Sequence, residues 1–382
     1  MGFKRKYLIC ILQHRKVDYA ITTFLHLHAA IRDSELRNEC KIIIATDLAS
    51  SFRFKTLHKA FRHLYDFEIH VCNNFYPEKL ASIFKKYPVD DYQVFIKCDE
   101  EIFLSPNTWK QFLTLSCGEL KKSSTLLTTV NLSTGIPSWY FFAKLFFNAS
   151  EMDVLDQALL KETLPSHLWG NDYSKLNESV RSFTAWDEIA YWDAVNDLPY
   201  FYKGIHPIRL NIYYTQYINR IILSRMDKFY NWPVGEQFRY VNENYFCNSF
   251  FAINYKEYQA ILSDKSLYVD VFDEVPLNRY KALYKKSFAF LDDSLAIHIT
   301  YNTTYNQTVV HEGEQMNGRM LEDHFQLQYK RRLQEYLGSK KNYTDLDIKS
   351  TVTIKLRSIN QFVKKVVKKV VKKMFIHADH QP

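Results

Sequence analysis

Three acidic side chains lie together inside an otherwise apolar stretch of this chain. Asp99, Glu100 and Glu101 follow the strand-like run 92–96 and precede the apolar residues 102–104. Clustered carboxylates repel one another and lose hydration when they are buried, so folding alone gives no reason for them. At a strand end, Asp99 and Glu101 can point the same way while Glu100 points elsewhere. Carboxylates in that arrangement suit Mn²⁺ or Mg²⁺, which in turn binds a diphosphate; the alternative is a solvent-exposed acidic turn.

The first hundred residues alternate between strand-like and helix-like patterns. This alternation predicts a parallel sheet of the doubly wound kind, in which ligands bind beyond the carboxyl ends of the strands. Asp47 and the acidic block both follow predicted strands, so they lie where that rule places functional groups. The predicted strands are 6–13, 41–46, 67–72 and 92–97, and the predicted helices are 19–31, 52–64 and 76–86.

The later part of the chain has a different pattern. Longer, aromatic-rich helical segments are predicted between residues 139 and 232. They are followed by predicted strands at 245–253 and 294–299 and by a charged helix at 320–336. No internal repeat is visible, and the length of 382 residues predicts one large or two ordinary domains.

The acidic block and its flanks resemble the signature of the GT-A glycosyltransferases, nucleotide-sugar-dependent enzymes, and of their family 2 in particular. That signature is a hydrophobic strand ending in D-x-D, followed by an apolar stretch and a helix. Residues 95–104, Pro106 and the run 109–113 have this layout, with Glu101 in place of the second Asp. By order of elements the resemblance covers residues 5–310, and it is specific around the acidic block. It implies an α/β fold, with a Rossmann-like mixed sheet flanked by helices and a helical insertion.

The resemblance also implies which residues contact the nucleotide of the donor. Leu12 and Gln13, in the loop after the first strand, would border the nucleotide. Asp47, after the second strand, is similar in place to the family's acidic contact to the base or ribose. A helix N-cap explains Asp47 equally well.

The metal and diphosphate would be held by the acidic block and by one residue from late in the chain. Asp99 and Glu101 would bind the metal, and Asp99 and Glu100 would lie against the donor diphosphate. Many metal-dependent members supply one more ligand, often His, from a late strand, and His298 is similar in place. The alternative is that His298 is a core histidine with its hydrogen bonds satisfied.

The acceptor side is expected in the second half of the chain. An inverting transferase needs a carboxylate that takes a proton from the acceptor hydroxyl, and Asp273 or Glu274 is a candidate for that base. A helix cap explains this acidic pair as well. Residues 243–251 mix polar and aromatic side chains, as sugar-binding grooves often do, and resemble the family's strand that faces the acceptor; a buried strand edge is the alternative. Residues 202–209 place Lys, His and Arg in one turn region, which suits a phosphate or an acidic sugar; a structural loop is the alternative. Their candidate contacts are Asn248, Ser249, His206 and Arg209.

Charge is distributed unevenly along the chain. Residues 351–382 hold eight Lys or Arg and one Asp, which leaves about +1 of the net +8 for residues 1–350. A nearly neutral body weighs against nucleic-acid binding. Within the tail, residues 360–375 have the pattern of a basic amphipathic helix, which would bind an anionic membrane surface. The alternative is a solvated tail.

Cellular location is inferred from the cysteines and the apolar runs. The six cysteines include no C-x-x-C pair, and no apolar run is long enough to span a bilayer. The run 7–12 is too short for the apolar region of a signal peptide. These features predict a cytoplasmic protein that associates peripherally with the inner face of the membrane.

The leading hypothesis is therefore a metal-dependent glycosyltransferase. It would transfer a sugar from a nucleotide-diphosphate donor, a UDP-sugar above all, to a glycan or lipid-linked acceptor in surface polysaccharide or glycoconjugate synthesis. A nucleotidyltransferase acting on sugar phosphates is an alternative, but residues 12–18 lack the Gly-rich phosphate loop it would need. A non-catalytic peripheral membrane protein is another. The expected division is a donor half at 1–130, an acceptor half at 131–312, a helical region at 313–348 and the basic tail at 349–382.

Overall fold

The computed structural model of this protein describes residues 5–14, 17–72, 76–133, 138–159, 212–241, 249–267 and 274–298. All of them lie in the first of two compact units, Met1–Tyr329. The charged helix predicted at 320–336 and the basic tail lie outside the described residues, so both remain predictions. Among the residues that are described, no helix has the length and apolar character needed to cross a bilayer.

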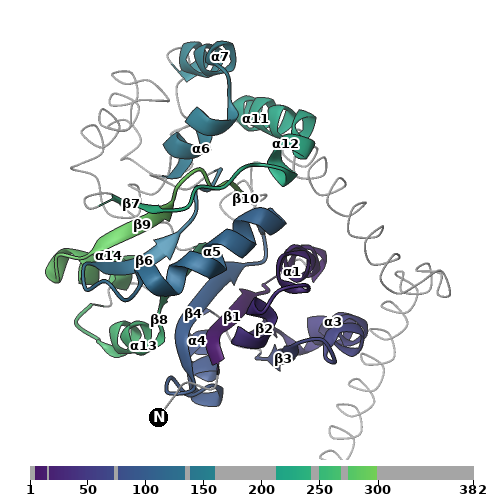
Figure 1. The fold of residues 1–382 in the computed structure, drawn as a ribbon, viewed down its shortest axis with the longest axis vertical. Coiled ribbons are helices and arrows are strands. Elements are labelled where there is room, and N and C mark those ends of the chain that lie inside the picture. Colours follow the sequence, from purple (N-terminus) through teal and green to yellow (C-terminus); the bar gives the residue numbers. More distant parts are fainter. Residues whose placement is uncertain are drawn as a thin grey trace, which may run out of the picture. The chain divides into compact units, whose positions relative to one another are not determined.

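The N-terminal part has the predicted parallel architecture. Four strands lie in the order β3-β2-β1-β4 and all run parallel (Figure 1). The strands are β1 (Arg5–Leu12), β2 (Cys40–Thr46), β3 (Asp66–Val71) and β4 (Tyr92–Asp99), and the helices between them are α1 (Val17–Ile31), α2 (Leu36–Glu39), α3 (Leu48–Phe61) and α4 (Tyr76–Lys86). The alternation predicted from the sequence is confirmed here. Helix α3 begins one turn earlier than predicted, because Asp47 caps it.

Beyond β4 the sheet becomes mixed. The strand order continues β4-β8-β6-β9-β7, and β8 runs antiparallel to both of its neighbours. Strand β9 is parallel to β6, and β7 is antiparallel to β9. These strands are β6 (Thr125–Thr129), β7 (Phe238–Val241), β8 (Phe250–Asn254) and β9 (Ser287–Leu291). The structure is therefore an α/β fold with one large mixed sheet flanked by helices.

The helices of this part lie on both sides of the sheet. They are α5 (Pro106–Glu119), α6 (Ser138–Phe146), α7 (Ala149–Leu159), α11 (Ile212–Ser224), α12 (Met226–Tyr230), α13 (Tyr255–Ser263) and α14 (Glu274–Leu283). Four of them, α6, α7, α11 and α12, fall in the region where helical segments are predicted. Of the strand predicted at 245–253, the described part begins at Ser249 and the observed strand at Phe250.

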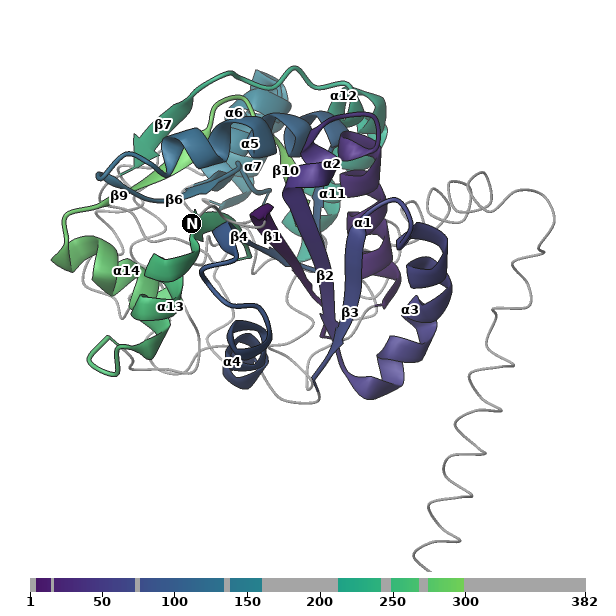
Figure 2. The same cartoon turned by 60° about the horizontal axis from the view of Figure 1, so that its bottom comes forward.

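Adjacent residues of β8 show how the two faces of the sheet are covered, because successive strand side chains point to opposite faces. Phe250 packs on Phe112 and Trp109 of α5, which crosses the front of the sheet in Figure 1. Phe251 points to the other face, where it meets Tyr258 of α13. Helix α4 shares this second face, and Figure 2 shows it well separated from α5.

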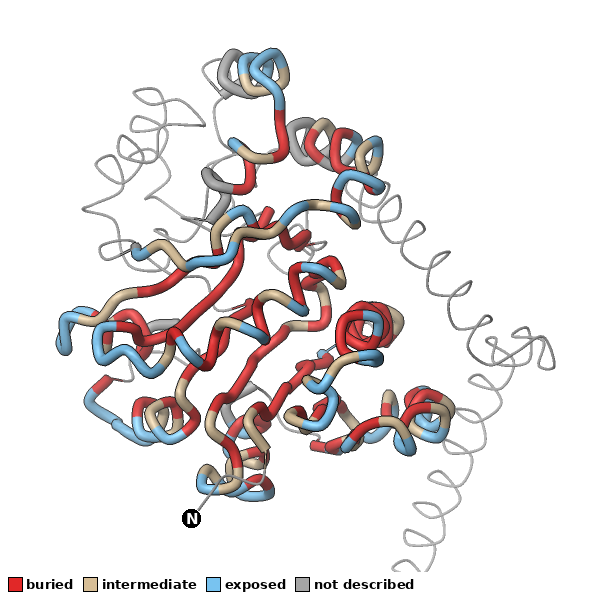
Figure 3. Tube along the Cα trace, in the orientation of Figure 1, coloured by how far each residue is buried: buried red, intermediate tan, exposed pale blue. Residues whose placement is uncertain are grey.

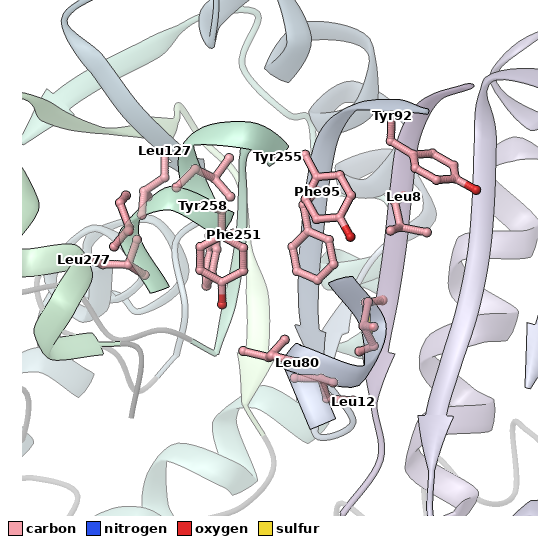
Figure 4. Close-up of a cluster of buried hydrophobic side chains, with 14 of the residues drawn as sticks. Leu8, Leu12, Leu80, Tyr92, Phe95, Leu127, Phe251, Tyr255, Tyr258 and Leu277 are labelled. Carbon is pink, nitrogen blue, oxygen red and sulfur yellow. The ribbon is translucent and has the colours of Figure 1, made fainter. Parts of the chain in front are cut away.

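The core on the second face fixes the central strands. Phe95 of β4 stacks on Tyr255 and Tyr258 of α13, with ring centroids 5.3 Å apart in both pairs (Figure 4). Leu80 of α4 and Leu8 of β1 belong to the same buried cluster. Figure 3 shows that burial is nearly continuous along the central strands. A polar side chain inside this region therefore needs a hydrogen-bonding or ion-pair partner there.

A short second sheet connects two distant parts of the chain. Strand β5 (Ile102–Leu104) follows the acidic block, and β10 (Ala296–His298) pairs with it in antiparallel orientation. The predicted strand 294–299 therefore exists, but it does not belong to the large sheet. Its partner is the apolar run directly after the acidic block, with His298 opposite Ile102.

His70 predicts an acid-sensitive contribution to stability. Burial lowers the pKa of His70 below its usual value of 6.5, and its ring contacts the Ser82 hydroxyl at 3.0 Å. Because the unfolded chain then binds more protons, stability that is complete above pH 6.5 falls as the pH drops. We expect this loss to be at most about 1.4 kcal/mol per pH unit and to be absent in His70→Gln. Urea unfolding of both proteins at several pH values measures it, and parallel pH curves would contradict it.

Candidate functional site

The carboxyl ends of β1, β2 and β4 meet at one edge of the sheet. The backbone N–H of Glu100 donates to the Leu12 carbonyl at 3.1 Å, and that of Asp99 donates to the Ser249 carbonyl at 2.9 Å. The N–H of Gln13 donates to the Ala45 carbonyl at 2.9 Å. The fold thus places four predicted donor-side residues and the predicted acceptor residue Ser249 in one region.

Glu101 and His298 are in direct contact. The Nε2 atom of His298 lies 3.0 Å from Oε1 of Glu101, although the residues are 197 positions apart in the sequence. The pairing of β10 with β5 creates this contact, and the Ser133 hydroxyl accepts the backbone N–H of His298 at 3.0 Å. The His298 side chain is 7% exposed and that of Glu101 29%. A buried imidazole and a carboxylate that is partly open to solvent are therefore held side by side.

Asp99 points to a different neighbour. One of its carboxylate oxygens, Oδ1, lies 3.5 Å from Nζ of Lys97, and the Lys97 side chain is only 1% exposed. Lys97 and Asp99 are two positions apart on β4, so both side chains lie on the same face of the sheet, the one that α4 and α13 cover. Within the described residues, no three His, Cys, Asp or Glu side chains are arranged to hold one metal ion. Of the three predicted metal ligands, Glu101 and His298 thus contact each other, whereas Asp99 contacts Lys97.

Glu100 is buried and serves the loop after β1. Its side-chain Oε2 accepts the backbone N–H of His14 at 3.1 Å, and its carbonyl accepts the Thr23 hydroxyl at 3.1 Å. The residue is 3% exposed. These contacts attach the acidic turn to α1 and to the loop after β1, so Glu100 supports the backbone next to Leu12 and Gln13.

Gln13 and Lys79 connect the ends of β1, β2 and α4. The side-chain oxygen of Gln13 accepts a hydrogen bond from the Thr46 hydroxyl. The backbone carbonyl of Gln13 accepts one from Nζ of Lys79 at 2.9 Å. Lys79 is 4% exposed, and burial lowers its pKa although Asp47 and Glu100 act in the opposite direction. Neither Lys79 nor Lys97 was among the site residues predicted from the sequence. Lys97 inside an apolar strand and Lys79 in the first turn of a helix, where a cation opposes the helix dipole, were the available signals.

Asp47 caps helix α3, as one of the two interpretations of the sequence predicted. Its Oδ1 accepts the Ser50 backbone N–H at 2.8 Å, and its Oδ2 accepts the Ser50 hydroxyl at 2.8 Å. Partial burial raises the pKa of this carboxyl, but the Ser50 hydrogen bonds outweigh it and hold the pKa below its usual range. The cap accounts for the residue structurally, and the predicted contact to a base or ribose remains a separate hypothesis.

The cap predicts a difference between two substitutions. Asp47→Ala should lower the free energy of unfolding by about 1 kcal/mol, because the first turn of α3 loses its acceptor. Asp47→Ser keeps an acceptor and should change stability by a few tenths of a kcal/mol. Chemical unfolding measures both values, and equal losses would show that the hydrogen bonds of Ser50 to Asp47 do not stabilise the helix.

The sequence matches no protein-family model and no curated protein. The geometry of the site and the sequence pattern are therefore the grounds on which a function can be argued.

Most of the predicted acceptor-side residues fall outside the described part of the chain. This holds for Asp273, Asn248, His206 and Arg209. Glu274 is the first residue of α14, and the helix-cap interpretation of the acidic pair stays a prediction because Asp273 is outside the described residues. Of the acceptor-side candidates, Ser249 alone is placed with its surroundings, next to the backbone of Asp99.

Proposed function

We propose that this protein is a metal-dependent glycosyltransferase with a GT-A-type fold that uses a nucleotide-diphosphate sugar, a UDP-sugar above all. The observation that carries the proposal is the contact between Glu101 and His298 at the carboxyl end of β4. A strand from late in the chain brings an imidazole to the acidic block that follows a buried parallel strand. The order of strands in the mixed sheet is compatible with a Rossmann-like donor half, which gives further support.

The side chains at this edge fit a divalent cation shared with a substrate. Mg²⁺ commonly takes one or two carboxylates from the protein and its remaining oxygens from phosphates and water, and Mn²⁺ accepts imidazole as well. Glu101 and His298 offer such a pair, and Asp99 lies two residues before Glu101. When bound there, Mn²⁺ or Mg²⁺ would act as a Lewis acid on the departing diphosphate.

The remaining residues would bind and orient the substrates. Leu12 and Gln13 would border the nucleotide, and Asp99 and Glu100 would position the donor diphosphate, Glu100 through its hold on the loop after β1. Asp273 or Glu274 would take the proton from the acceptor hydroxyl. Asn248, Ser249, His206 and Arg209 would contact the acceptor, a glycan or a lipid-linked sugar at the inner face of the membrane.

The test is a donor panel with the full-length protein. UDP- and GDP-sugars are incubated with Mn²⁺ or Mg²⁺, and release of the nucleoside diphosphate is measured with and without a chelator. We expect one donor to be hydrolysed or transferred in the presence of metal and its turnover to cease when the chelator is added. If no nucleotide sugar binds or turns over, the proposal is wrong.

Asp47→Ser separates the two possible roles of that residue. This variant keeps the helix cap but removes the carboxylate. If the carboxylate contacts the ribose or base, the KM for the donor should rise about tenfold while kcat changes little, because a binding interaction present in both ground and transition states is lost. An unchanged KM in a stable variant would assign Asp47 to the helix cap alone.

A further inference from the structure

The outward side of α3 combines cations with exposed apolar side chains. Phe52 and Leu48 are 48% and 52% exposed, although both are large and apolar. Lys55, Lys59 and Arg62 are exposed beside them. The helix contains no acidic residue, although its N-cap is Asp47. The α3 surface consists of Leu48, Phe52, Lys55, Lys59 and Arg62.

Burial of the opposite side of α3 fixes the orientation of this surface. Ser51, Phe54, Leu57 and Phe61 are the buried residues of the helix. Phe61 packs on Phe24 of α1 with ring centroids 5.0 Å apart. The helix therefore cannot rotate to bury Phe52 without exposing its own core side, and Phe52 remains at the surface.

The cations of the α3 surface differ from the neighbouring Arg53 in their partners among the described residues. Arg53 of the same helix is paired with Asp18 at 2.8 Å. In the part of the chain that the structure describes, no carboxylate forms an ion pair with Lys55, Lys59 or Arg62. Lys55 lies over the Phe52 ring, with Nζ 4.3 Å from the ring centroid, so a cation and an apolar ring are presented together.

The surface begins at the edge of the sheet that carries the candidate site. Asp47 ends the connection from β2, and Leu48 is the first residue of α3. At the neighbouring strand end, Val71 of β3 is 44% exposed, and Cys72 donates its backbone N–H to the Thr46 carbonyl at 2.8 Å. The apolar end of the α3 surface is thus adjacent to the carboxyl edge of the parallel strands.

We propose that the α3 surface docks on an anionic lipid bilayer. Lys and Arg side chains that contact the headgroups, together with Phe or Leu side chains that insert between them, are the features by which a protein surface binds an anionic membrane interface. A nucleic-acid ligand would use the cations but would leave Leu48 and Phe52 without a function. Docking through the α3 surface does not depend on sugar transfer. That it brings the candidate site to a lipid-linked acceptor rests on the proposed function.

The experiment measures partition of the full-length protein onto vesicles of phosphatidylcholine with and without phosphatidylglycerol. Because residues 360–375 are themselves predicted to bind such vesicles, each variant is made in the natural chain and in a chain whose six tail lysines are replaced by Gln. In the second background we expect Lys55→Gln/Lys59→Gln to lower partition onto anionic vesicles about 30-fold, since each Lys contributes on the order of a factor of five. Leu48→Ser/Phe52→Ser should lower it at least about tenfold.

Matched controls use exposed residues elsewhere. Lys110→Gln/Lys121→Gln removes two exposed charges at α5, and Leu283→Ser/Tyr284→Ser removes two exposed apolar side chains at α14. Both pairs should leave partition within about twofold of the parent. Unchanged partition in both α3 variants would overturn the proposal. So would a loss confined to the lysine variant and accompanied by an equal loss of binding to a labelled single-stranded oligonucleotide, which would make the surface a nucleic-acid site.

Discussion

Glu101→Gln is expected to lower donor turnover at least about a hundredfold while the protein remains folded. The substitution keeps a hydrogen-bonding partner for His298 at nearly the same size but removes the charge that would bind a cation. Loss of one such electrostatic group typically costs a factor of about 10²–10³ in rate. The measurement is release of nucleoside diphosphate at saturating donor, together with the affinity of the protein for Mn²⁺ from its electron paramagnetic resonance signal.

His298→Gln should give a similar loss, and the double variant tests whether the two residues act together. If both bind one ion, the double variant should be no slower than the slower single variant, because residues that act as a unit are not additive. Independent, multiplying losses would mean that the 3.0 Å contact between Glu101 and His298 is a structural ion pair. Asp33→Asn, at an exposed carboxylate after α1, is the matched control and should leave turnover unchanged.

The parallel half of the fold was predictable because its signals are local. Strand β2, for example, is a run of apolar residues between polar connections, and its ends agree with the prediction to within one residue. Helix α4 begins and ends where the apolar pattern predicts. Each of these signals is contained in about ten residues of sequence, which is the length over which periodicity can be recognised.

The mixed half was not predictable in the same way, because its contacts join distant segments. Cys98 of β4 pairs with Phe250 of β8, and nothing in either segment specifies the other. The same reason explains the candidate site. The sequence indicated that Glu101 and His298 could bind the same metal ion, but it could not show that β10 pairs with β5 to bring them together. It also could not show that Lys97 lies beside Asp99, because this depends on the tertiary burial of β4.

The ion pair between Lys97 and Asp99 makes Asp99 important for stability as well as for the proposed activity. Asp99→Asn should lower the free energy of unfolding by on the order of 2 to 3 kcal/mol, because Lys97 is fully buried and loses the carboxylate 3.5 Å away. The cost is below that of a completely buried pair, since the Asp99 side chain is 18% exposed. Urea unfolding measures it. A loss of turnover in this variant is therefore not evidence for metal or donor binding until the loss of stability has been separated from it.

A second substitution makes that separation. Asp99→Asn/Lys97→Met removes both charges and should recover most of the lost stability, because a buried apolar side chain needs no counter-ion. If Asp99 also positions the donor diphosphate, the double variant should be stable but inactive; recovered turnover would show that Asp99 only compensates the charge of Lys97.

The Lys41–Asp66 pair is the control for burial. Its atoms are closer, at 2.6 Å, but Asp66 is 37% exposed, so Asp66→Asn should cost less than about 1 kcal/mol. Equal costs for Asp66→Asn and Asp99→Asn would mean that burial of Lys97 does not determine the energy of its pair.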